Sequence, residues 1–470
     1  MVVARSLWGL WGVVFRPRPA IVPVVAIAAA AAANIVPISY EQAKPSLAAY
    51  PDQRPAALRG KTDAQIAAAW PAWVAKHNAE IRARLERGDE DSIVNFWLYG
   101  TSFTKAPRAT EQDVARLGSR NEVAELLEAR VDDLVAGIRS PGSNERLQFA
   151  RRVVERHGIT PEGPQGADRT RAYLIQLRER MIAETERYRK TLQSASLLAD
   201  DRAKLAAFAT AYRDRGLSSD TSIQPDFALD AAIADAKRSG IIDRVRRVAI
   251  VGPGLDFSDK AEGYDFYPVQ TLQPFAVIDS LIRHGVAGDG DLSVATLDLS
   301  PRVNLHLERA RTNARDDMNY LVQLPLSDDD AIRQWDPALV AYWQHFGDQI
   351  GDEVTAMKPP EGAGKLRVRA VRIRYAIVEK LEPHDVNIVL ERLTAQFDLI
   401  IATNILVYYD PFEQSLALTN IAAMLRPGGL FVTNYAVSPL PPMEPKAAAV
   451  VPVFWDNQKQ GDTLFWYRKN

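Results

Sequence analysis

The sequence has no cysteine among its 470 residues, so disulfides, thiolate metal sites and a cysteine nucleophile are excluded. Histidine is also scarce: the six histidines are scattered and show no ligand spacing such as HExxH, so no metal site is expected. The chain also has no large excess of positive or negative charge. Lys and Arg number 57 and Asp and Glu 59, and the net charge of −2 does not indicate a nucleic-acid partner.

The composition is that of a globular protein. Hydrophobic residues make up 47% of the chain and charged residues 25%, which is sufficient for a sizeable buried core. The length of 470 residues predicts two or three domains rather than one.

Residues 1–38 are unlike the rest of the chain. Arginines precede an apolar run from Ala20 to Ala33, a pattern typical of a secretory signal peptide. The alternative is an uncleaved membrane anchor over Ala20–Ile38, whose length is close to that of a membrane span. Both predict a protein exported to, or anchored on, the periplasmic side. A mis-assigned start codon predicts a cytoplasmic protein instead.

The next two segments differ in their periodicity. Residues 39–59 contain three prolines and little periodicity, which predicts a linker. Residues 60–239 repeat a helical period and predict a mostly α-helical domain. This domain either selects a substrate or partner, or is a cap whose charged helix faces are solvated. Its aromatic run Asn95–Phe103 either lines a pocket or packs a domain interface.

From residue 240 onwards, strands alternate with helices, which predicts an α/β domain over residues 240–470. A β-branched strand, Arg247–Val251, is followed by Gly252-Pro253-Gly254. The two glycines allow the backbone to approach a cofactor closely, although a turn without a ligand is the alternative. The full dinucleotide fingerprint is absent because Phe257 stands where the third glycine is needed.

A second predicted strand, Leu292–Leu297, ends in Asp298. A carboxylate at a strand tip can accept hydrogen bonds from both hydroxyls of a ribose. Alternatively, Asp298 begins a turn or caps a helix through Ser300. The spacing between the glycines and Asp298 is longer than usual, and the polar stretch Asp256–Pro268 is the expected insertion.

Residues 305–365 form a long excursion before the remaining strands. An acidic triplet at residues 328–330 predicts a helix N-terminus rather than a metal site. The alternating stretch Arg369–Val378 predicts the third strand of the sheet. Val450–Trp455 and Thr463–Arg468 predict a closing antiparallel hairpin.

The segment Phe397–Asn434 combines a buried strand, a helix, a Gly-rich turn and a second strand. Such a βαβ unit needs a right-handed crossover in an open sheet. Ligands of these sheets bind at the carboxyl ends of the strands. The pair Thr403-Asn404 and the run Tyr408-Tyr409-Asp410 are therefore predicted to lie where the chemistry takes place.

Four stretches together resemble class I S-adenosylmethionine-dependent methyltransferases, and most closely the CheR-type methyltransferase domain. FDLIIATNILVYYD with LRPGGLFV is similar to the fourth and fifth strands of that family, and VATLDLSPRVNLHLERAR to its second strand and following helix. VRIRYAIVEKLEP is similar to its third strand, and QPFAVIDSLI to the helix after its first motif. The resemblance implies an α/β fold with a Rossmann-like class I methyltransferase sheet, preceded by a mostly α-helical domain, and S-adenosylmethionine as the cofactor.

The resemblance also implies roles for individual residues. Gly252 and Gly254, with Asp256 beside them, would line the methionine and ribose parts of the cofactor. Asp298 would hold the ribose hydroxyls. Asn404 and Tyr408 would be the catalytic pair beside the sulfonium and the acceptor, and Asn404 would also contact the cofactor.

The chain departs from the family pattern at four positions. Ile250 replaces an acidic residue before the first glycine, and Gln273 replaces a glutamate. Thr403 replaces an arginine, and Ile377 replaces a polar residue that contacts adenine.

The sequence therefore predicts a methyltransferase that transfers a methyl group to an unknown acceptor, a carboxylate or another oxygen or nitrogen group, with a protein among the candidates. A carboxylate acceptor needs no general base, whereas an amine or alcohol does. One alternative is an exported, catalytically inactive Rossmann-like binding protein that no longer uses the cofactor. Another is a nucleotide- or sugar-binding α/β enzyme of a different class.

Overall fold

The computed structural model describes residues 35–470 except 111–113, 115–116, 118, 199–206, 208–214, 258–263, 328–333, 438–442 and 445–446. Most of the predicted leader, residues 1–34, and the acidic triplet at 328–330 lie outside the described residues. None of the helices within the described ranges is long and apolar enough to cross a membrane.

A seven-stranded sheet forms the centre of the molecule, with the strand order β11-β12-β10-β9-β2-β3-β7. Five neighbouring strands are parallel, and β12 is antiparallel to both β10 and β11. The strands are β2 (Arg247–Val251), β3 (Ser293–Asp298), β7 (Leu381–Asp385), β9 (Phe397–Ala402), β10 (Leu425–Thr433), β11 (Ala449–Phe454) and β12 (Gly461–Arg468). The predicted closing hairpin is confirmed as β11 and β12.

Helices cover both faces of this sheet because its strands alternate buried side chains between the faces. Val248 and Ile250 of β2 belong to a core with α9 (Ile223–Arg238), α10 (Gln273–Arg283) and α11 (Pro301–Arg315). Ala249 and Val251 belong to the opposite core, with α14 (Pro411–Met424) and α2 (Tyr40–Ala49). The protein therefore has a Rossmann-like α/β fold with a largely helical N-terminal region.

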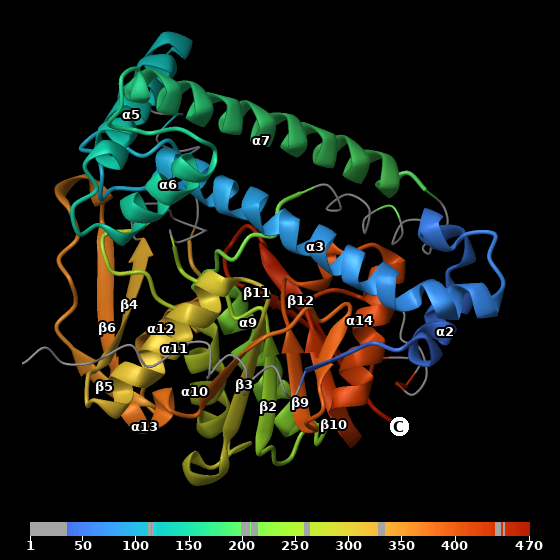
Figure 1. The fold of residues 1–470 in the computed structure, drawn as a ribbon. Helices are drawn as coiled ribbons and strands as arrows, with labels where there is room; N and C mark the ends of the chain where they lie inside the picture. Colours follow the sequence, from blue (N-terminus) through green and yellow to red (C-terminus); the bar gives the residue numbers. More distant parts are fainter. Residues whose placement is uncertain are drawn as a thin grey trace, which may run out of the picture.

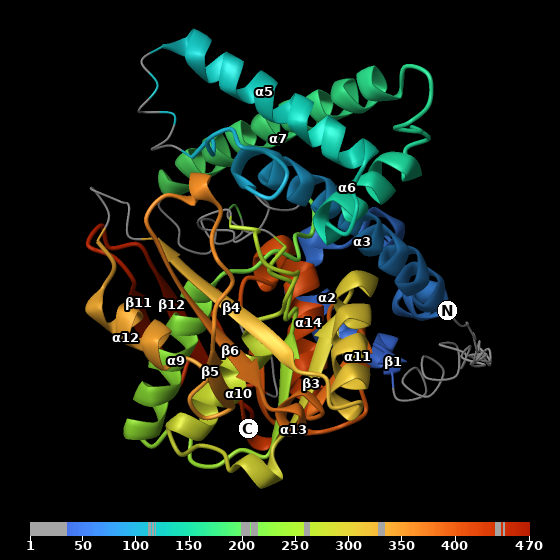
Figure 2. The ribbon, with the colours of Figure 1, turned by 90° about the vertical axis from the view of Figure 1, so that its left-hand side faces the viewer.

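The helical region lies beyond the carboxyl ends of the parallel strands (Figures 1 and 2). It consists of α3 (Asp63–Tyr99), α5 (Arg120–Arg139), α6 (Glu145–Arg156) and α7 (Gly166–Ser196). Helix α3 is joined to the sheet domain by polar contacts: His77 Nε2 lies 2.9 Å from Glu413 Oε1, and Arg84 Nη2 donates to the Tyr408 carbonyl at 2.8 Å. Phe96 and Trp97 are buried, and the Phe96 ring contacts Phe257, so the aromatic run packs an interface.

The predicted linker over residues 39–59 is wrong, because this segment is folded. Ser39 and Gln42 form a capping box that begins α2. Ala43, Leu47 and Leu58 are buried, and α2 packs against α14. Before α2, the short strand β1 (Ile35–Pro37) pairs with β8 (Glu391–Leu393), so the last residues of the predicted membrane anchor belong to a two-stranded sheet.

The predicted third strand is also wrong. Residues of the alternating stretch form β6 (Leu366–Ile373), which pairs antiparallel with β4 (Tyr320–Ser327) and β5 (Gly351–Val354) in a separate sheet. The stretch then enters the short helix α13 (Tyr375–Val378), where Ile377 is buried. The third strand of the main sheet is β7, which follows α13. The inserted sheet, together with α12 (Pro337–His345), packs on the same core as α9 and α10.

Candidate functional site

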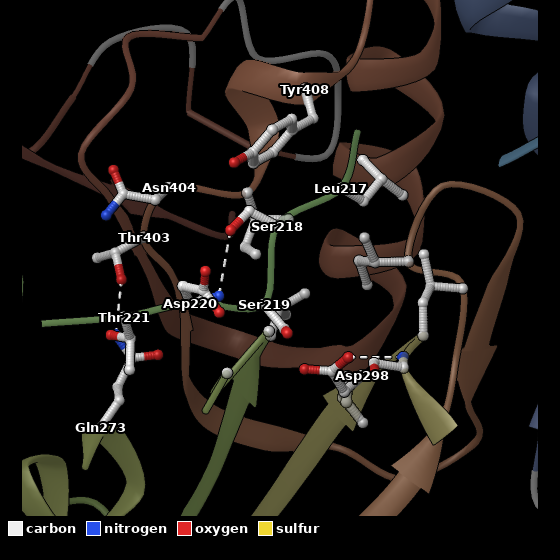
Figure 3. A pocket seen from close by; sticks show the side chains of 18 of the residues that line it. Leu217, Ser218, Ser219, Asp220, Thr221, Gln273, Asp298, Thr403, Asn404 and Tyr408 are labelled. Carbon is white, nitrogen blue, oxygen red and sulfur yellow. Dashed lines mark hydrogen bonds between the residues drawn. The ribbon is translucent and has the colours of Figure 1, made fainter. Parts of the chain in front are cut away.

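A cavity opens at the carboxyl ends of β2, β3 and β9, where the chain order of the strands reverses on either side of β2 (Figure 3). Five of the six predicted site residues line it: Gly252, Gly254, Asp298, Asn404 and Tyr408. They come from three different strand ends, so the fold brings together residues that lie up to 156 positions apart (408 − 252).

The turn after β2 is closely packed at both glycines. Gly252 and Gly254 have φ values of +66° and +67°, which favour glycine. A Cβ on Gly252 would lie 2.1 Å from Ile405 Cδ1, and a Cβ on Gly254 would lie 2.6 Å from the carbonyl oxygen of Ser219. The bare backbone of this turn therefore forms part of the cavity wall.

Asp298 lies at the tip of β3 with only 7% of its surface exposed. Burial raises the pKa of its carboxyl group to about 6, although the backbone amides of Ser300 and Gly254 act in the opposite direction. Ser300 N donates to Asp298 Oδ1 at 2.7 Å. The two predicted roles are therefore compatible, since Asp298 lines the cavity and also stabilises the turn before α11.

Asn404 follows β9 in a left-handed conformation, with φ of +58°. Its backbone N–H donates to Asn434 Oδ1 at 2.8 Å, and Asn434 Nδ2 donates to Asn404 Oδ1 at 2.9 Å. Asn434 Nδ2 also donates to Asp462 Oδ2 at 3.2 Å. Side chains after β10 and within β12 thus fix both the backbone and the amide group of Asn404.

Tyr408 closes the upper side of the cavity in Figure 3. It ends the short 3-10 turn Leu406–Tyr408, and Arg84 of the helical region holds its carbonyl group. The helical region therefore contributes to the position of a residue that was predicted to orient the acceptor.

Asp256 does not line the cavity, so its predicted role in binding the cofactor is corrected. Its carboxylate accepts from Tyr267 Oη at 2.9 Å and from Gln270 Nε2 at 2.8 Å, and only 1% of the residue is exposed. The chain leaves the cavity at Leu255, whose N–H donates to the carbonyl of Ser219 at 2.7 Å. Asp256 is instead a buried polar contact that joins the two ends of the insertion.

Sequence reasoning missed the segment Leu217–Ser222, which crosses the cavity before α9. Thr221 N donates to the carbonyl of Leu255 at 3.2 Å, so this segment is tied to the turn after β2. Ser92 Oγ of α3 donates to both carboxylate oxygens of Asp220, at 3.0 and 2.9 Å. The segment has no periodicity, and its richness in Ser, Thr and Asp was the only available signal.

Gln273 and Thr403 also line the cavity, although they depart from the family pattern. Gln273 Nε2 donates to Thr403 Oγ1 at 2.7 Å, so the two departures compensate each other by forming one buried hydrogen bond. Near Asp298, the side chains of Val386 and Ile388 add an apolar part to the wall. No histidine is among the residues that line this cavity, and the described part of the chain contains no acidic or histidine cluster that fits a metal ion.

The comparisons with known proteins give only distant structural similarity. Neither a family model nor a curated protein matches the chain. Among solved structures, the chain is similar to the N-methyltransferase NodS from Bradyrhizobium japonicum WM9 in complex with S-adenosylhomocysteine, with 12% identity over 51% of this chain and 85% of that one and a TM-score of 0.24.

Two further similar structures are also methyltransferases. One is the magnesium protoporphyrin IX methyltransferase ChlM from Synechocystis PCC 6803 with bound S-adenosylmethionine, with 9% identity over 58% of this chain and 86% of that one and a TM-score of 0.25. The other is an O-methyltransferase family protein from Burkholderia thailandensis, with 11% identity, 77% and 98% coverage and a TM-score of 0.26. The strand order, rather than these likenesses, defines the fold.

Proposed function

We propose that the protein is an S-adenosylmethionine-dependent methyltransferase. One observation carries the proposal: the glycine turn after β2 and the buried carboxylate of Asp298 on the neighbouring strand face the same cavity as Asn404 and Tyr408. This is the arrangement that binds a ligand with a ribose at the switch point of an open α/β sheet.

The lining residues suit each part of this cofactor. The backbone at Gly252 and Gly254 presents no side chain to a close ligand. Asp298 can accept hydrogen bonds from a ribose diol, and Val386 and Ile388 provide apolar surface for a base. When bound, the cofactor supplies an activated methyl group on a sulfonium centre.

The contribution of the protein is then mainly alignment. Asn404 and Tyr408 are held by Asn434 and Arg84, so their positions in the cavity wall are fixed before a ligand arrives. Fixed groups that orient an acceptor in line with the reacting centre lower the entropic part of the barrier. Asp220, which also lines the cavity, is our candidate for the general base that an amine or alcohol acceptor would need.

We also propose which chemical groups can accept the methyl group. A carboxylate acceptor of the CheR type needs no general base, which is compatible with a cavity lined by no histidine. Because Gln273 and Thr403 depart from the CheR-type pattern, other oxygen and nitrogen groups stay among the candidate acceptors.

Transfer of labelled methyl groups tests the proposal and sorts the acceptors. The full-length protein is incubated with methyl-labelled S-adenosylmethionine and either protein or small-molecule fractions of a cell extract. Label that is released by mild base identifies carboxyl methyl esters, and label that resists base identifies amine or ether acceptors. The absence of both cofactor binding and transferred label would contradict the methyltransferase and support the inactive binding protein that no longer uses the cofactor.

We further propose, from the sequence pattern of residues 1–38, that the protein is exported or membrane-anchored. Cell fractionation followed by N-terminal sequencing tests this. A cytosolic protein that retains Met1 would contradict it, whereas a cytosolic protein that begins at a later residue would support a mis-assigned start.

A further inference from the structure

A chain of three buried polar side chains begins in the wall of the cavity. Thr403 and Gln273 of α10 both line the cavity, and Asp226 of α9 interacts with the Gln273 side chain (Figure 3 shows the first two). Their exposed fractions are 4%, 4% and 1%. Polar groups that are buried to this extent are normally hydrogen-bonded, so the partners of each atom in this chain can be asked for one by one.

The atoms that lack a partner show where a proton must be. Gln273 Nε2 donates to Thr403 Oγ1 at 2.7 Å. Gln273 Oε1 and both carboxylate oxygens of Asp226 have no hydrogen-bond donor in the described part of the chain. The Gln273 side chain is nevertheless close enough to Asp226 to influence the pKa of its carboxyl group. Two facing acceptors are satisfied at once if the Asp226 carboxyl group is protonated and donates to Gln273 Oε1.

The groups around Asp226 favour its neutral form. Burial, together with the negative charge of Asp256, raises the pKa of Asp226 to about 8, although the Gln273 side chain acts in the opposite direction. Tyr342 of α12, whose own pKa is raised by burial and by the charge of Asp226, faces it from the inserted unit. In the other orientation of the Gln273 amide, Nε2 would point toward Asp226 and donate to an ionised carboxylate. That carboxylate would be buried, and none of the groups named here is a cation that could balance its charge.

The direction of this chain determines what Thr403 offers to a ligand. Its oxygen accepts from Gln273, and no group in the described ranges accepts the hydrogen of its hydroxyl group. A threonine hydroxyl has one hydrogen to donate, and Thr403 lines the cavity. The hydroxyl therefore faces the ligand as a donor, and its natural partner is a hydrogen-bond acceptor.

The sheet places this donor opposite the ribose site. Asp298 lies at the end of β3 and Thr403 at the end of β9, and these two strands flank β2 on either side. A ligand whose ribose is held at Asp298 and which crosses the turn at Gly252 ends near Thr403. In the proposed cofactor, that end is the amino-acid part, which carries one ammonium group and one carboxylate.

We propose that Thr403 binds the carboxylate of the cofactor's amino-acid end, and that Gln273 and Asp226 are positioning residues that set the polarity of its hydroxyl group. This assignment rests on the proposed function, which it refines by naming the ligand group at one strand end. Removing the Thr403 hydroxyl then weakens only those ligands that carry the carboxylate.

Calorimetric titration of the full-length protein with two ligands tests this. S-adenosylhomocysteine carries the carboxylate, and 5′-deoxy-5′-(3-aminopropylthio)adenosine is the same molecule without it. Thr403→Val, which keeps the shape of the side chain, is expected to weaken the first ligand about tenfold or more and to leave the second within about twofold, because a hydrogen bond to a charged group contributes that much. Thr403→Ser, which keeps the hydroxyl group, is expected to restore the stronger binding of S-adenosylhomocysteine relative to the ligand without the carboxylate.

Asp226 variants provide a readout that a purely structural role would not give. Asp226→Asn can still donate to Gln273 Oε1 and is expected to keep the preference for S-adenosylhomocysteine, whereas Asp226→Leu cannot donate and is expected to lose it. Equal weakening of both ligands by Thr403→Val, or weakening of neither, would overturn the assignment. If the wild-type protein bound neither ligand, the proposed function itself would fail, and this result is distinguishable from the others.

Discussion

Asn404 and Asn434 bind each other through two hydrogen bonds, of 2.8 and 2.9 Å, at the ends of the neighbouring strands β9 and β10. One bond holds the backbone of Asn404 in its left-handed conformation, and the other fixes its side-chain amide. Because Asn434 occupies Asn404 Oδ1, the Nδ2 group of Asn404 is left for a ligand. Asn434 itself is outside the cavity lining, so it acts on the site only through Asn404.

We expect Asn434→Ala to reduce methyl transfer about tenfold or more, because Asn404 is then no longer held in place. The free energy of unfolding should fall by only about 1 kcal/mol, because Asn404 is exposed and water can replace the lost hydrogen bonds. Steady-state turnover and chemical denaturation measure the two effects. Asn313→Ala, at an exposed position of α11, is the matched control and should change neither. Unchanged turnover in Asn434→Ala would show that Asn404 does not depend on this contact.

Cofactor affinity should fall at low pH because of Asp298. Burial raises the pKa of its carboxyl group to about 6, so the group is mostly ionised at pH 7.5 and mostly protonated at pH 5. A protonated carboxyl group loses capacity to accept hydrogen bonds from a diol. Titrations of S-adenosylhomocysteine at several pH values should show weaker binding below about pH 6 in the wild type. Asp298→Asn should bind weakly at every pH, and a parallel pH dependence in this variant would assign the titration to another group.

The turn after β2 should tolerate no side chain at Gly254. Gly254→Ala places a Cβ 2.6 Å from the carbonyl oxygen of Ser219 and also occupies a positive φ. Gly285→Ala is a matched control, since Gly285 has φ of +64° but nothing within 4 Å of its added Cβ. We expect the first variant to lose about 1–3 kcal/mol more unfolding free energy than the second, because only the first combines backbone strain with overpacking. Equal losses would mean that the segment Leu217–Ser222 moves away freely.

Asp226 should make the protein less stable as pH rises. The pKa of its carboxyl group is about 8 in the folded protein, against an ordinary value of 3.8. Between these pH values the folded state holds one more proton than the unfolded chain. The contribution of Asp226 to the free energy of unfolding is therefore complete below about pH 4. It falls by about 1.4 kcal/mol for each pH unit between pH 4 and pH 8. The unfolding free energy of Asp226→Asn should therefore rise relative to wild type across this range.

Denaturation curves at intervals from pH 4.5 to 8 measure this difference, with the exposed substitution Asp316→Asn as the control. A constant difference between Asp226→Asn and wild type would show that Asp226 is ionised in the folded protein. It would also remove the proton that the polar chain behind Thr403 requires.

The sequence predicted the central sheet better than its surroundings. β2, β3 and β9 each contain a run of four apolar or β-branched residues, and each run ends beside a polar or glycine residue that lines the cavity. β7 reads Leu-Glu-Pro-His-Asp, which has no such pattern. The alternating stretch that contains β6 therefore predicts the third strand of the main sheet in place of β7. Periodicity identified β6 correctly as a strand, but it cannot state which sheet a strand joins.

The missed parts of the site depend on tertiary contacts. Asp220 lines the cavity because Ser92 and the turn at Gly254 hold its segment in place, and both are distant in sequence. Asp256 lies only two residues after Gly254, yet it turns inward to Gln270. In α2, by contrast, a local signal existed: Ser39 and Gln42 have the spacing of a capping box, which the prolines of that segment obscured.

The most direct test of the central claim is calorimetric titration of the full-length wild-type protein with S-adenosylhomocysteine at pH 7.5. A cavity that joins Gly252, Gly254 and Asp298 predicts saturable binding of one ligand per chain, at ligand concentrations well below millimolar. No heat of binding up to millimolar ligand would contradict the methyltransferase assignment and leave a Rossmann-like fold without this cofactor.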